Sequence, residues 1–149
     1  MDAYLREATE KDTDILFCWV NDPAVRESAF STKRISYTEH TEWYKNFLKR
    51  TDSKQYIYMY NNEAVGQARV EICRNEAEID YSICREKRHM GHGKKLLKLL
   101  CIQVRIDFPD VQKLIARVKT DNIASQRAFI TAGYTEKFSL FELDILNME

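Results

Sequence analysis

The sequence predicts a single α/β domain over residues 1–149, with a mixed, mostly antiparallel sheet and helices on both faces. Two observations support this fold class. Residues 56–84 contain three strand-like segments separated by two short turns, which is typical of an antiparallel meander. A helical pattern then separates the strand at 77–84 from another at 113–119. A helical connection of this kind joins parallel strands through a right-handed crossover, so the sheet should hold one central parallel pair.

The first elements expected along the chain are a strand at 2–8 and a helix at about 12–20. Thr9 and Asp12 are suitable caps for this helix. It should end before Pro23, because the residue preceding proline avoids the helical region.

The next helix should begin at Ser36 and end near Lys49, since Ser36 and Glu39 have the spacing of a capping box. Its apolar side is expected to carry Trp43, Phe47 and Leu48. The meander follows, with strands at 56–60, 65–73 and 77–84 and turns at Asn61-Asn62 and Arg74-Asn75. The remaining expected elements are a helix ending near Phe108, the strand 113–119, a helix at 122–132 with Gly133 as its C-cap, and a last strand at 138–146.

Composition and charge exclude several classes of partner. Hydrophobic residues make up 44% of the chain, and 23 Lys and Arg balance 23 Asp and Glu. A zero net charge offers no general attraction to nucleic acid or to a membrane surface, so neither is expected as a partner. No signal peptide and no apolar stretch of about 20 residues is present, which predicts a cytoplasmic protein.

The cysteines predict no metal site. Cys18, Cys73, Cys84 and Cys101 form no C-x-x-C pair, and no His lies at a metal-finger spacing from them. Three of the four lie in apolar segments, where a free Cys behaves as a small hydrophobe. We therefore interpret them as buried, reduced thiols.

The strongest local signal is Arg88-His89-Met90-Gly91-His92-Gly93, which follows a strand and opens a helix. Glycines adopt positive φ and let a ligand approach the backbone closely. Free N–H groups at a helix N-terminus bind phosphate, and Lys94 and Lys95 add positive charge. The motif predicts an anion-binding loop, with an ordinary glycine-rich turn as the alternative.

This loop resembles the pyrophosphate-binding signature Q/R-x-x-G-x-G/A of the GNAT acetyltransferases. The segment Asn122-x-x-Ser125-x-Arg127-Ala128-Phe129, followed by Gly133-Tyr134, is similar to the second signature of that superfamily. Together the two signatures cover about residues 77–134. The resemblance implies a GNAT fold whose parallel strands splay at an acetyl-CoA site, and direct transfer of an acetyl group to a primary amine.

The resemblance also implies which residues bind acetyl-CoA. They are Ile83 and Cys84 on the strand, Arg88, His89, Met90, Gly91, His92, Gly93 and Lys94 in the loop, and Asn122, Ser125 and Phe129 on the following helix. Many family members have a Tyr in place of Phe129, and that Tyr protonates the departing thiolate. Ser125, Tyr81 and Tyr134 are the hydroxyls that remain. Unaided departure is the alternative, since a thiol has a pKa of only about 8.5.

For the general base, the resemblance to histone-type members favours Glu78, on a strand segment similar to the one that carries their catalytic Glu. Asp80 lies on the same face of the strand, two residues along. His40 is a further candidate, and water alone is another. The sequence leaves the base open among these.

The N-terminal half indicates an acceptor. The segments Phe17-x-Trp19-x-Asn21-Asp22-Pro23-x-Val25-Arg26 and Ser36-x-x-Glu39-His40-x-x-Trp43-x-x-x-Phe47 are similar to the acetyltransferases of the pseudaminic-acid pathway. This implies that the 4-amino group of a UDP-linked amino-dideoxy sugar is the acceptor. The residues implied to bind it are Trp19, Asn21, Arg26, Glu39, His40 and Trp43.

Two other functions remain open. One is a ribosomal-protein-type N-terminal or small-amine acetyltransferase. The other is a sensor module that binds acyl-CoA without turnover, which the absent hydroxyl at Phe129 would fit. The sequence is compatible with a homodimer but determines neither the oligomeric state nor the length of the acyl chain.

Overall fold

Five strands form one sheet in the order of the sequence in the computed structural model, which describes residues 2–147. The four antiparallel strands are β1 (Ala3–Glu7), β2 (Ser53–Tyr60), β3 (Glu63–Cys73) and β4 (Glu76–Ile83). β5 (Lys113–Ile115) pairs with β4 in parallel. The expected fold class, a mixed sheet with one parallel pair, is therefore confirmed, but the pair lies at an edge of the described sheet and not at its centre, because no strand pairs with the far side of β5.

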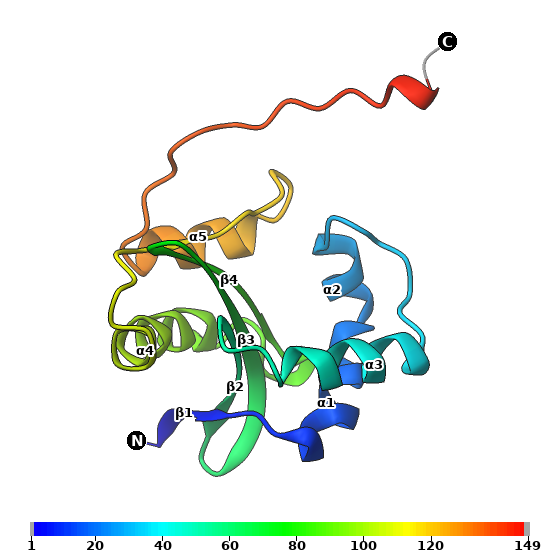
Figure 1. The fold of residues 1–149 in the computed structure, drawn as a ribbon. Helices are drawn as coiled ribbons and strands as arrows, with labels where there is room; N and C mark the ends of the chain where they lie inside the picture. Colours follow the sequence, from blue (N-terminus) through cyan, green and yellow to red (C-terminus); the bar gives the residue numbers. More distant parts are fainter. Residues whose placement is uncertain (1, 148–149) are drawn as a thin grey trace.

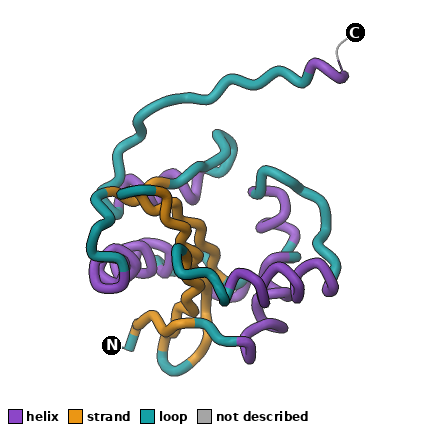
Figure 2. Tube along the Cα trace, viewed as in Figure 1, coloured by secondary structure: helices purple, strands orange, loops and turns teal. Residues whose placement is uncertain are grey.

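Helices cover both faces of the sheet (Figure 1). One side carries α1 (Thr13–Val20), α2 (Pro23–Ser28) and α3 (Tyr37–Phe47), and the other carries α4 (His92–Asp107) and α5 (Ile123–Thr131). Short 3-10 turns at Glu10–Asp12, Arg85–Lys87 and Ile145–Asn147 complete the secondary structure (Figure 2). No described helix is long and apolar enough to cross a membrane.

The chain enters α1 through a capped turn that also anchors α3. Thr9 and Asp12 cap this turn reciprocally, and both oxygens of Asp12 accept hydrogen bonds from Arg6, at 2.8 and 2.9 Å. The hydroxyl of Tyr44 on α3 donates to the Thr9 carbonyl at 2.6 Å. These contacts hold α3 beside the start of α1.

The buried side of α3 differs from the one expected. Trp43 and Leu48 are 41% and 36% exposed, whereas His40, Tyr44 and Phe47 are buried. Positions 40, 44 and 47 follow the i, i+4, i+7 spacing of one helix face, and Trp43 lies beside that face. The sequence prediction was therefore right for Phe47, wrong for Trp43 and Leu48, and missed the burial of His40 and Tyr44.

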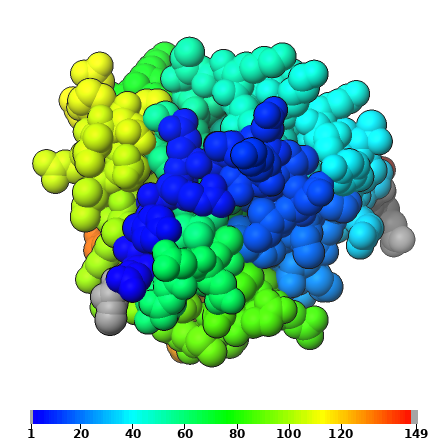
Figure 3. Space-filling view, turned by 90° about the horizontal axis from the view of Figure 1, so that it is seen from below, coloured from blue at the N-terminus to red at the C-terminus, as the bar shows by residue number. Residues whose placement is uncertain are grey.

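The main core lies between the sheet and α4. Leu96, Leu97, Leu100 and Val104 are at most 1% exposed and pack in one cluster with buried residues of β2, β3 and β4. Seen from below, the N-terminal residues drawn in blue lie at the centre of the surface, between segments drawn in green, yellow and cyan (Figure 3). The cavity described below lies on the β4–β5 side of the sheet, at the opposite edge from β1.

The predicted last strand is wrong. Residues 138–146 form no strand in the structure and leave the domain after α5 (Figures 1 and 2). Phe138, Phe141 and Leu146 are 83%, 93% and 90% exposed. An apolar pattern favours a strand only where a neighbouring strand is available to pair with it.

Two other expectations need correction. The sequence prediction stopped the first helix at Pro23 and missed α2, which begins at that residue because proline is well tolerated in a first helical turn. The cysteines are free thiols but not buried: Cys18, Cys73 and Cys101 are exposed, and Cys84 is intermediate. Cys101, for example, lies between the buried Leu100 and Ile102, which is 59% exposed, on the outer side of α4.

Candidate functional site

The site begins where the parallel ladder ends. β4 and β5 are paired only from Glu76 to Glu78 on β4, and β4 continues to Ile83 without β5 as its neighbour. A cavity of about 1060 Å³ occupies this opening. Segment 116–118, the first turns of α4 and α5, and the three N-terminal helices also line it.

Most of the residues that the sequence singled out line this one cavity. They are Trp19, Arg26, Glu39, His40, Trp43, Asp80, Ile83, Arg88, His89, Gly91, His92, Gly93, Lys94, Asn122, Ser125 and Phe129. Asn21, Glu78, Cys84 and Met90 are not among its lining residues. The fold thus brings residues from the whole chain to one place.

The loop before α4 has the backbone expected of an anion site. His89 and Gly91 have φ of 63° and 83°, and Gly91 is the N-cap of α4. The first N–H groups of a helix lack intrahelical partners, so those of the first turn remain available to a ligand. Lys94 is exposed at the cavity, while Met90 is 62% exposed away from it.

Arg88 joins this loop to two other elements. Its Nη2 donates to Asp22 at 2.9 Å and its Nε to the Ile83 carbonyl at 3.1 Å. Asp22 also caps α2 through the backbone N–H groups of Ala24 and Val25. The guanidinium therefore connects α2, β4 and the loop, and its fork is largely used within the protein.

His92 is part of the protein interior as well as of the cavity wall. It is 4% exposed, and its Nδ1 shares a 2.8 Å hydrogen bond with the hydroxyl of Tyr58. Burial lowers the pKa of His92, with the nearby positive charges of Lys95 and Lys87 acting in the same direction. Burial likewise raises the pKa of Tyr58, to about 12. The loop is thereby anchored to β2 by a neutral pair.

Tyr81, Ser125 and Phe129 form a cluster on the other side of the opening. The Ser125 hydroxyl donates to that of Tyr81 at 3.3 Å, and the rings of Tyr81 and Phe129 meet edge to face at 5.5 Å. Asn122 caps α5 by accepting from the Ser125 N–H. Burial raises the pKa of Tyr81, so its phenol is protonated at neutral pH.

The two candidate carboxylates have different surroundings. Asp80 lines the cavity, where Gln67 Nε2 is 3.4 Å and Arg69 Nη2 is 4.0 Å away. Glu78 instead accepts from Arg117 at 3.3 Å, near the end of the parallel ladder. Although both lie on one face of β4, only Asp80 reaches the cavity.

A row of polar side chains crosses β2, β3 and β4 beside Asp80. It was not predicted from the sequence. Gln55 donates to Gln67 at 2.7 Å, and Gln67 donates to Ser82 at 3.1 Å. All three line the cavity, and Gln55 is only 4% exposed. Alternate residues of adjacent strands share a face, so the strand register could have suggested this row once the pairing was known.

Aromatic side chains form the wall opposite the sheet. Trp19, His40 and Trp43 line it, and the Arg69 guanidinium lies 5.2 Å from the Trp43 ring centroid. His40 is 4% exposed and its Nε2 donates to the Thr13 carbonyl at 3.0 Å. Burial lowers the pKa of His40, which is therefore a neutral imidazole at neutral pH.

Asn21 and Arg26 hold the chain that follows α2. The Asn21 side chain exchanges two 2.8 Å hydrogen bonds with the backbone of Ile35. Arg26 donates to three carbonyls, those of Val20, Ser31 and Lys33. Both residues, expected to bind substrate, thus shape the wall through the backbone, and Arg26 also lines the cavity.

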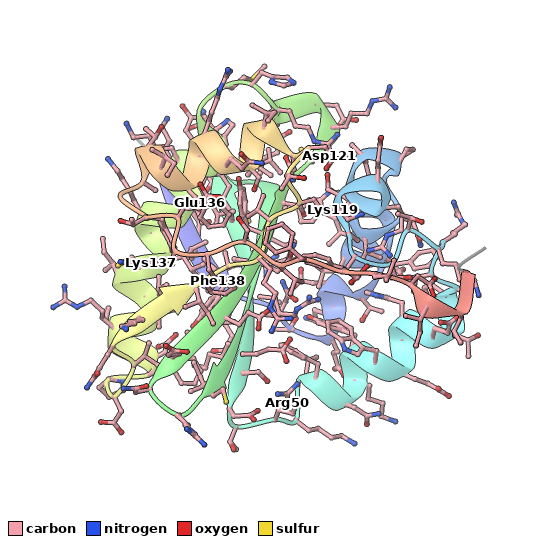
Figure 4. All side chains as sticks on the ribbon, turned by 90° about the horizontal axis from the view of Figure 1, so that it is seen from above. Arg50, Lys119, Asp121, Glu136, Lys137 and Phe138 are labelled. Atoms are coloured by element: carbon pink, nitrogen blue, oxygen red, sulfur yellow. The ribbon has the colours of Figure 1, made fainter. Side chains whose placement is uncertain are left out.

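A further contact spans the opening between α2 and the segment after β5, on the side where the sequence predicted the coenzyme. Lys119, after β5, donates to the Glu27 carbonyl at 3.1 Å. Seen from above, Lys119 and Asp121 lie between α5 and α2 (Figure 4).

Over residues 2–147, no cluster of three His, Cys, Asp or Glu side chains is placed to bind a metal ion.

Comparison with known proteins gives one family match. The model of a family described as an acetyltransferase (GNAT) domain matches residues 3–135. Among curated proteins, none has a significant sequence match.

Several solved structures share this fold. The aminoglycoside acetyltransferase AAC(6')-Ib, solved with ribostamycin and coenzyme A, is 22% identical at a TM-score of 0.81, with 92% of this chain and 85% of that one covered. Spermidine N-acetyltransferase from Vibrio cholerae, in complex with CoA and spermine, is 17% identical at 0.83, with 93% and 83% covered. A ribosomal L7/L12 alpha-N-protein acetyltransferase in complex with coenzyme A is 20% identical at 0.77, with 89% and 80% covered.

Proposed function

The chain belongs to the acetyltransferase (GNAT) domain family, and on this premise we propose that it transfers the acetyl group of acetyl-CoA directly to a primary amine. The observation that carries the proposal is the cavity at the splayed strands. The loop before α4, with its positive φ values and free helix N–H groups, lies on one side, and a polar, aromatic half lies on the other. A coenzyme with a diphosphate and an amine acceptor would then meet above β4.

Acetyl-CoA is assigned to the side formed by the loop, β4 and α5. The N–H groups of the first turn of α4 and the Lys94 ammonium suit its diphosphate. Ile83, at the open end of β4, and Asn122, at the start of α5, would flank the pantetheine arm. The backbone N–H groups of unpaired β4 are candidate donors for the tetrahedral oxyanion.

Asp80 is the general base that the site supports best. It lines the cavity, whereas Glu78 is not among the lining residues and its carboxylate is engaged by Arg117. The Nε2 of His40 is engaged by a backbone carbonyl. Asp80 would accept the amine proton directly or through one water.

For the acceptor we favour the 4-amino group of a UDP-linked amino-dideoxy sugar over a polyamine. The charged residues lining the described cavity are mostly basic, with only two acidic ones: Arg26, Arg69, Lys87, Arg88, Lys94, Arg117 and Arg127 against Glu39 and Asp80. Lys87, Arg88, Lys94 and Arg127 lie on the side assigned to acetyl-CoA, so the acceptor half keeps Arg26, Arg69 and Arg117 beside Glu39 and Asp80, and its cations could bind a nucleotide diphosphate. Trp19 and Trp43 offer flat surfaces for a base or a sugar, and the Gln55–Gln67 row offers amides for its hydroxyls.

The test is thiol release from acetyl-CoA with the purified chain and a panel of amines. The panel contains a UDP-4-amino-4,6-dideoxy sugar, ribosomal N-terminal peptides and spermidine. Turnover of the UDP-sugar alone is the expected result, and turnover of peptides or spermidine alone would refute the sugar assignment. Asp80→Asn serves as the control, because it should still bind coenzyme in calorimetry. Binding without turnover of any amine would favour the acyl-CoA sensor.

A further inference from the structure

The amide of Gln55 lies at one end of the polar row that crosses β2, β3 and β4. Gln55 is 4% exposed and lines the cavity. Its Nε2 donates to the Ala68 carbonyl at 3.0 Å and to Gln67 Oε1 at 2.7 Å, and the Tyr56 carbonyl is 3.4 Å away. A carbonyl oxygen can only accept, so the two backbone carbonyls fix which atom of the amide is the nitrogen. The N–H groups of Gln55 are therefore used within the protein.

The amide oxygen of Gln55, in contrast, has no donor. Within the described part of the chain, no N–H or O–H group donates to its Oε1. The atom is not sealed in the core either, because the sealed side-chain oxygens without a partner in residues 2–147 are those of Ser53 and Tyr134. An acceptor so far removed from bulk water is unfavourable until a bound group donates to it. The cavity is the space from which such a group can reach Oε1.

The rest of the row takes its direction from Gln55. Because Gln67 Oε1 accepts from Gln55, the Nε2 of Gln67 faces β4. There it donates to Ser82 Oγ at 3.1 Å and lies 3.4 Å from Asp80 Oδ2. Ser82 is opposite Gln67 in the register of β3 and β4. The protein thus holds the row from strand to strand, and Gln55 Oε1 is the acceptor left at its β2 end.

Gln55 and Asp80 are too far apart to contact the same group of a ligand. They lie on β2 and β4, with Gln67 of β3 between them. Neighbouring strands are about 5 Å apart, so the backbones of β2 and β4 are about 10 Å apart. An acceptor whose amine lies at Asp80 therefore reaches Gln55 with a different group, several bonds from that amine.

We propose that Gln55 determines the specificity for the acceptor: its Oε1 accepts a hydrogen bond from an O–H or N–H group that the acceptor carries several bonds from its reacting amine. This inference rests on the proposed function and extends it. A UDP-linked amino sugar has two kinds of such donor, its sugar hydroxyls and the imide N–H of its uracil. An amine without a donor at this place leaves Oε1 unpaired, and a site built in this way rejects it.

The experiment measures binding of the UDP-4-amino-4,6-dideoxy sugar by calorimetry, with coenzyme A bound in place of acetyl-CoA so that no turnover occurs. In one set of analogues each sugar hydroxyl is replaced in turn by fluorine, which cannot donate. Another analogue carries a methyl group on the uracil imide nitrogen. In the wild type, one analogue should bind about tenfold to a hundredfold more weakly than the parent compound, and it identifies the donor. In Gln55→Met, the parent and that analogue should bind equally.

Gln112→Met is the matched control, because Gln112 is bonded to Asn75 and lies outside the cavity lining. It should show the same difference between parent and analogue as the wild type. Gln55→Met also removes the bond to the Ala68 carbonyl, so its melting temperature is measured beside that of the wild type. A loosened fold would weaken the parent and every analogue by the same factor, and that result would overturn the proposal. A wild type that binds all analogues as tightly as the parent would overturn it without any variant.

Turnover separates this proposal from the proposed function. A wild type that acetylates the UDP-sugar, with the same analogue preference in Gln55→Met, keeps the proposed function and overturns the role of Gln55. A wild type that acetylates only a peptide or spermidine refutes the sugar assignment, and the KM for that amine then decides about Gln55. A rise of about tenfold in Gln55→Met, with kcat unchanged, would support the proposal, and an unchanged KM would overturn it. A wild type that acetylates no amine refutes the proposed function and the role of Gln55 with it.

Discussion

Asp22 and Arg88 are 66 residues apart in the chain, yet Asp22 Oδ1 accepts a 2.9 Å hydrogen bond from Arg88 Nη2. The two side chains are 15% and 25% exposed, so the ion pair is largely shielded from water. It joins the start of α2, on the acceptor side, to the loop before α4, on the coenzyme side. The two halves of the cavity are thus linked by a single guanidinium.

Replacing Arg88 by Lys should lower the free energy of unfolding by about 1–3 kcal/mol, since an ammonium cannot reach both Asp22 and the Ile83 carbonyl as the fork does. The KM for acetyl-CoA should rise as the loop loosens. Although burial alone would raise the pKa of Asp22, the hydrogen bonds from Arg88 and Val25 lower it. The pair therefore stabilises fully above the unfolded pKa of 3.8 and loses its effect as pH falls through the folded value.

Urea unfolding at about pH 7 and about pH 3 measures this, with the wild type and Arg88→Lys compared at each pH. The difference in stability should be larger at the higher pH than at the lower one. A difference that is the same at both would show that Asp22 does not carry the interaction.

Asp80→Asn should lower kcat by about a hundredfold, since it removes the cavity-facing carboxylate. Glu78→Gln should change kcat little, because that side chain does not line the cavity and is engaged by Arg117. Steady-state kinetics of the two variants with one accepted amine provide the comparison. A larger loss of kcat in Glu78→Gln than in Asp80→Asn would identify Glu78 as the base, as the family resemblance implied.

Stability should decline as pH falls below 6.5, the unfolded pKa of histidine, because burial lowers the pKa of His40 and of His92 in the folded protein. The unfolded chain binds protons first, so the loss runs from 6.5 down to the folded values. Melting temperature against pH measures this. His40→Gln and His92→Gln should each flatten the curve, and the exposed His89→Gln is the matched control. An unchanged slope in both variants would contradict the prediction.

Gly66→Ala should be strongly destabilising, since its Cβ would lie 2.5 Å from the Ser82 carbonyl oxygen on β4. The β3–β4 ladder would have to part, at a cost of about 3 kcal/mol. Gly133→Ala is the comparison: it has φ of +99° and open space around it, so only backbone strain of about 1–2 kcal/mol is expected. Chemical denaturation of both variants would rank them, and equal costs would show that the strands adjust freely.

Local chemistry in the sequence was sufficient for most elements of the fold. Ser36 caps α3 where its spacing to Glu39 predicted, and Gly133 ends α5 with a positive φ. The Asn61-Asn62 turn has the positive φ values expected of it. Such features depend on residues a few positions apart, which the sequence displays directly.

Neither the structure of residues 138–146 nor the roles of several polar side chains could be predicted from the local sequence. Residues 138–146 have the apolar character of a strand but no partner within the described sheet. Asn21 and Arg88 were expected to contact ligands. In the structure, Asn21 donates to the Ile35 carbonyl, and Arg88 donates to Asp22 and to the Ile83 carbonyl. A polar side chain can serve a ligand or the protein, and the choice depends on which groups the fold brings near it.

The sequence by itself determined most of the elements and the parallel crossover, and it predicted an anion site in the loop before α4, because caps, turns and periodicity are local properties. Only the tertiary structure decided that β5 leaves β4 after Glu78, that Asp80 rather than Glu78 reaches the opening, and that the hydroxyls of Tyr81 and Ser125 meet. These relationships depend on where distant segments come to lie once the core has packed, and side-chain volume and strand register fix that arrangement.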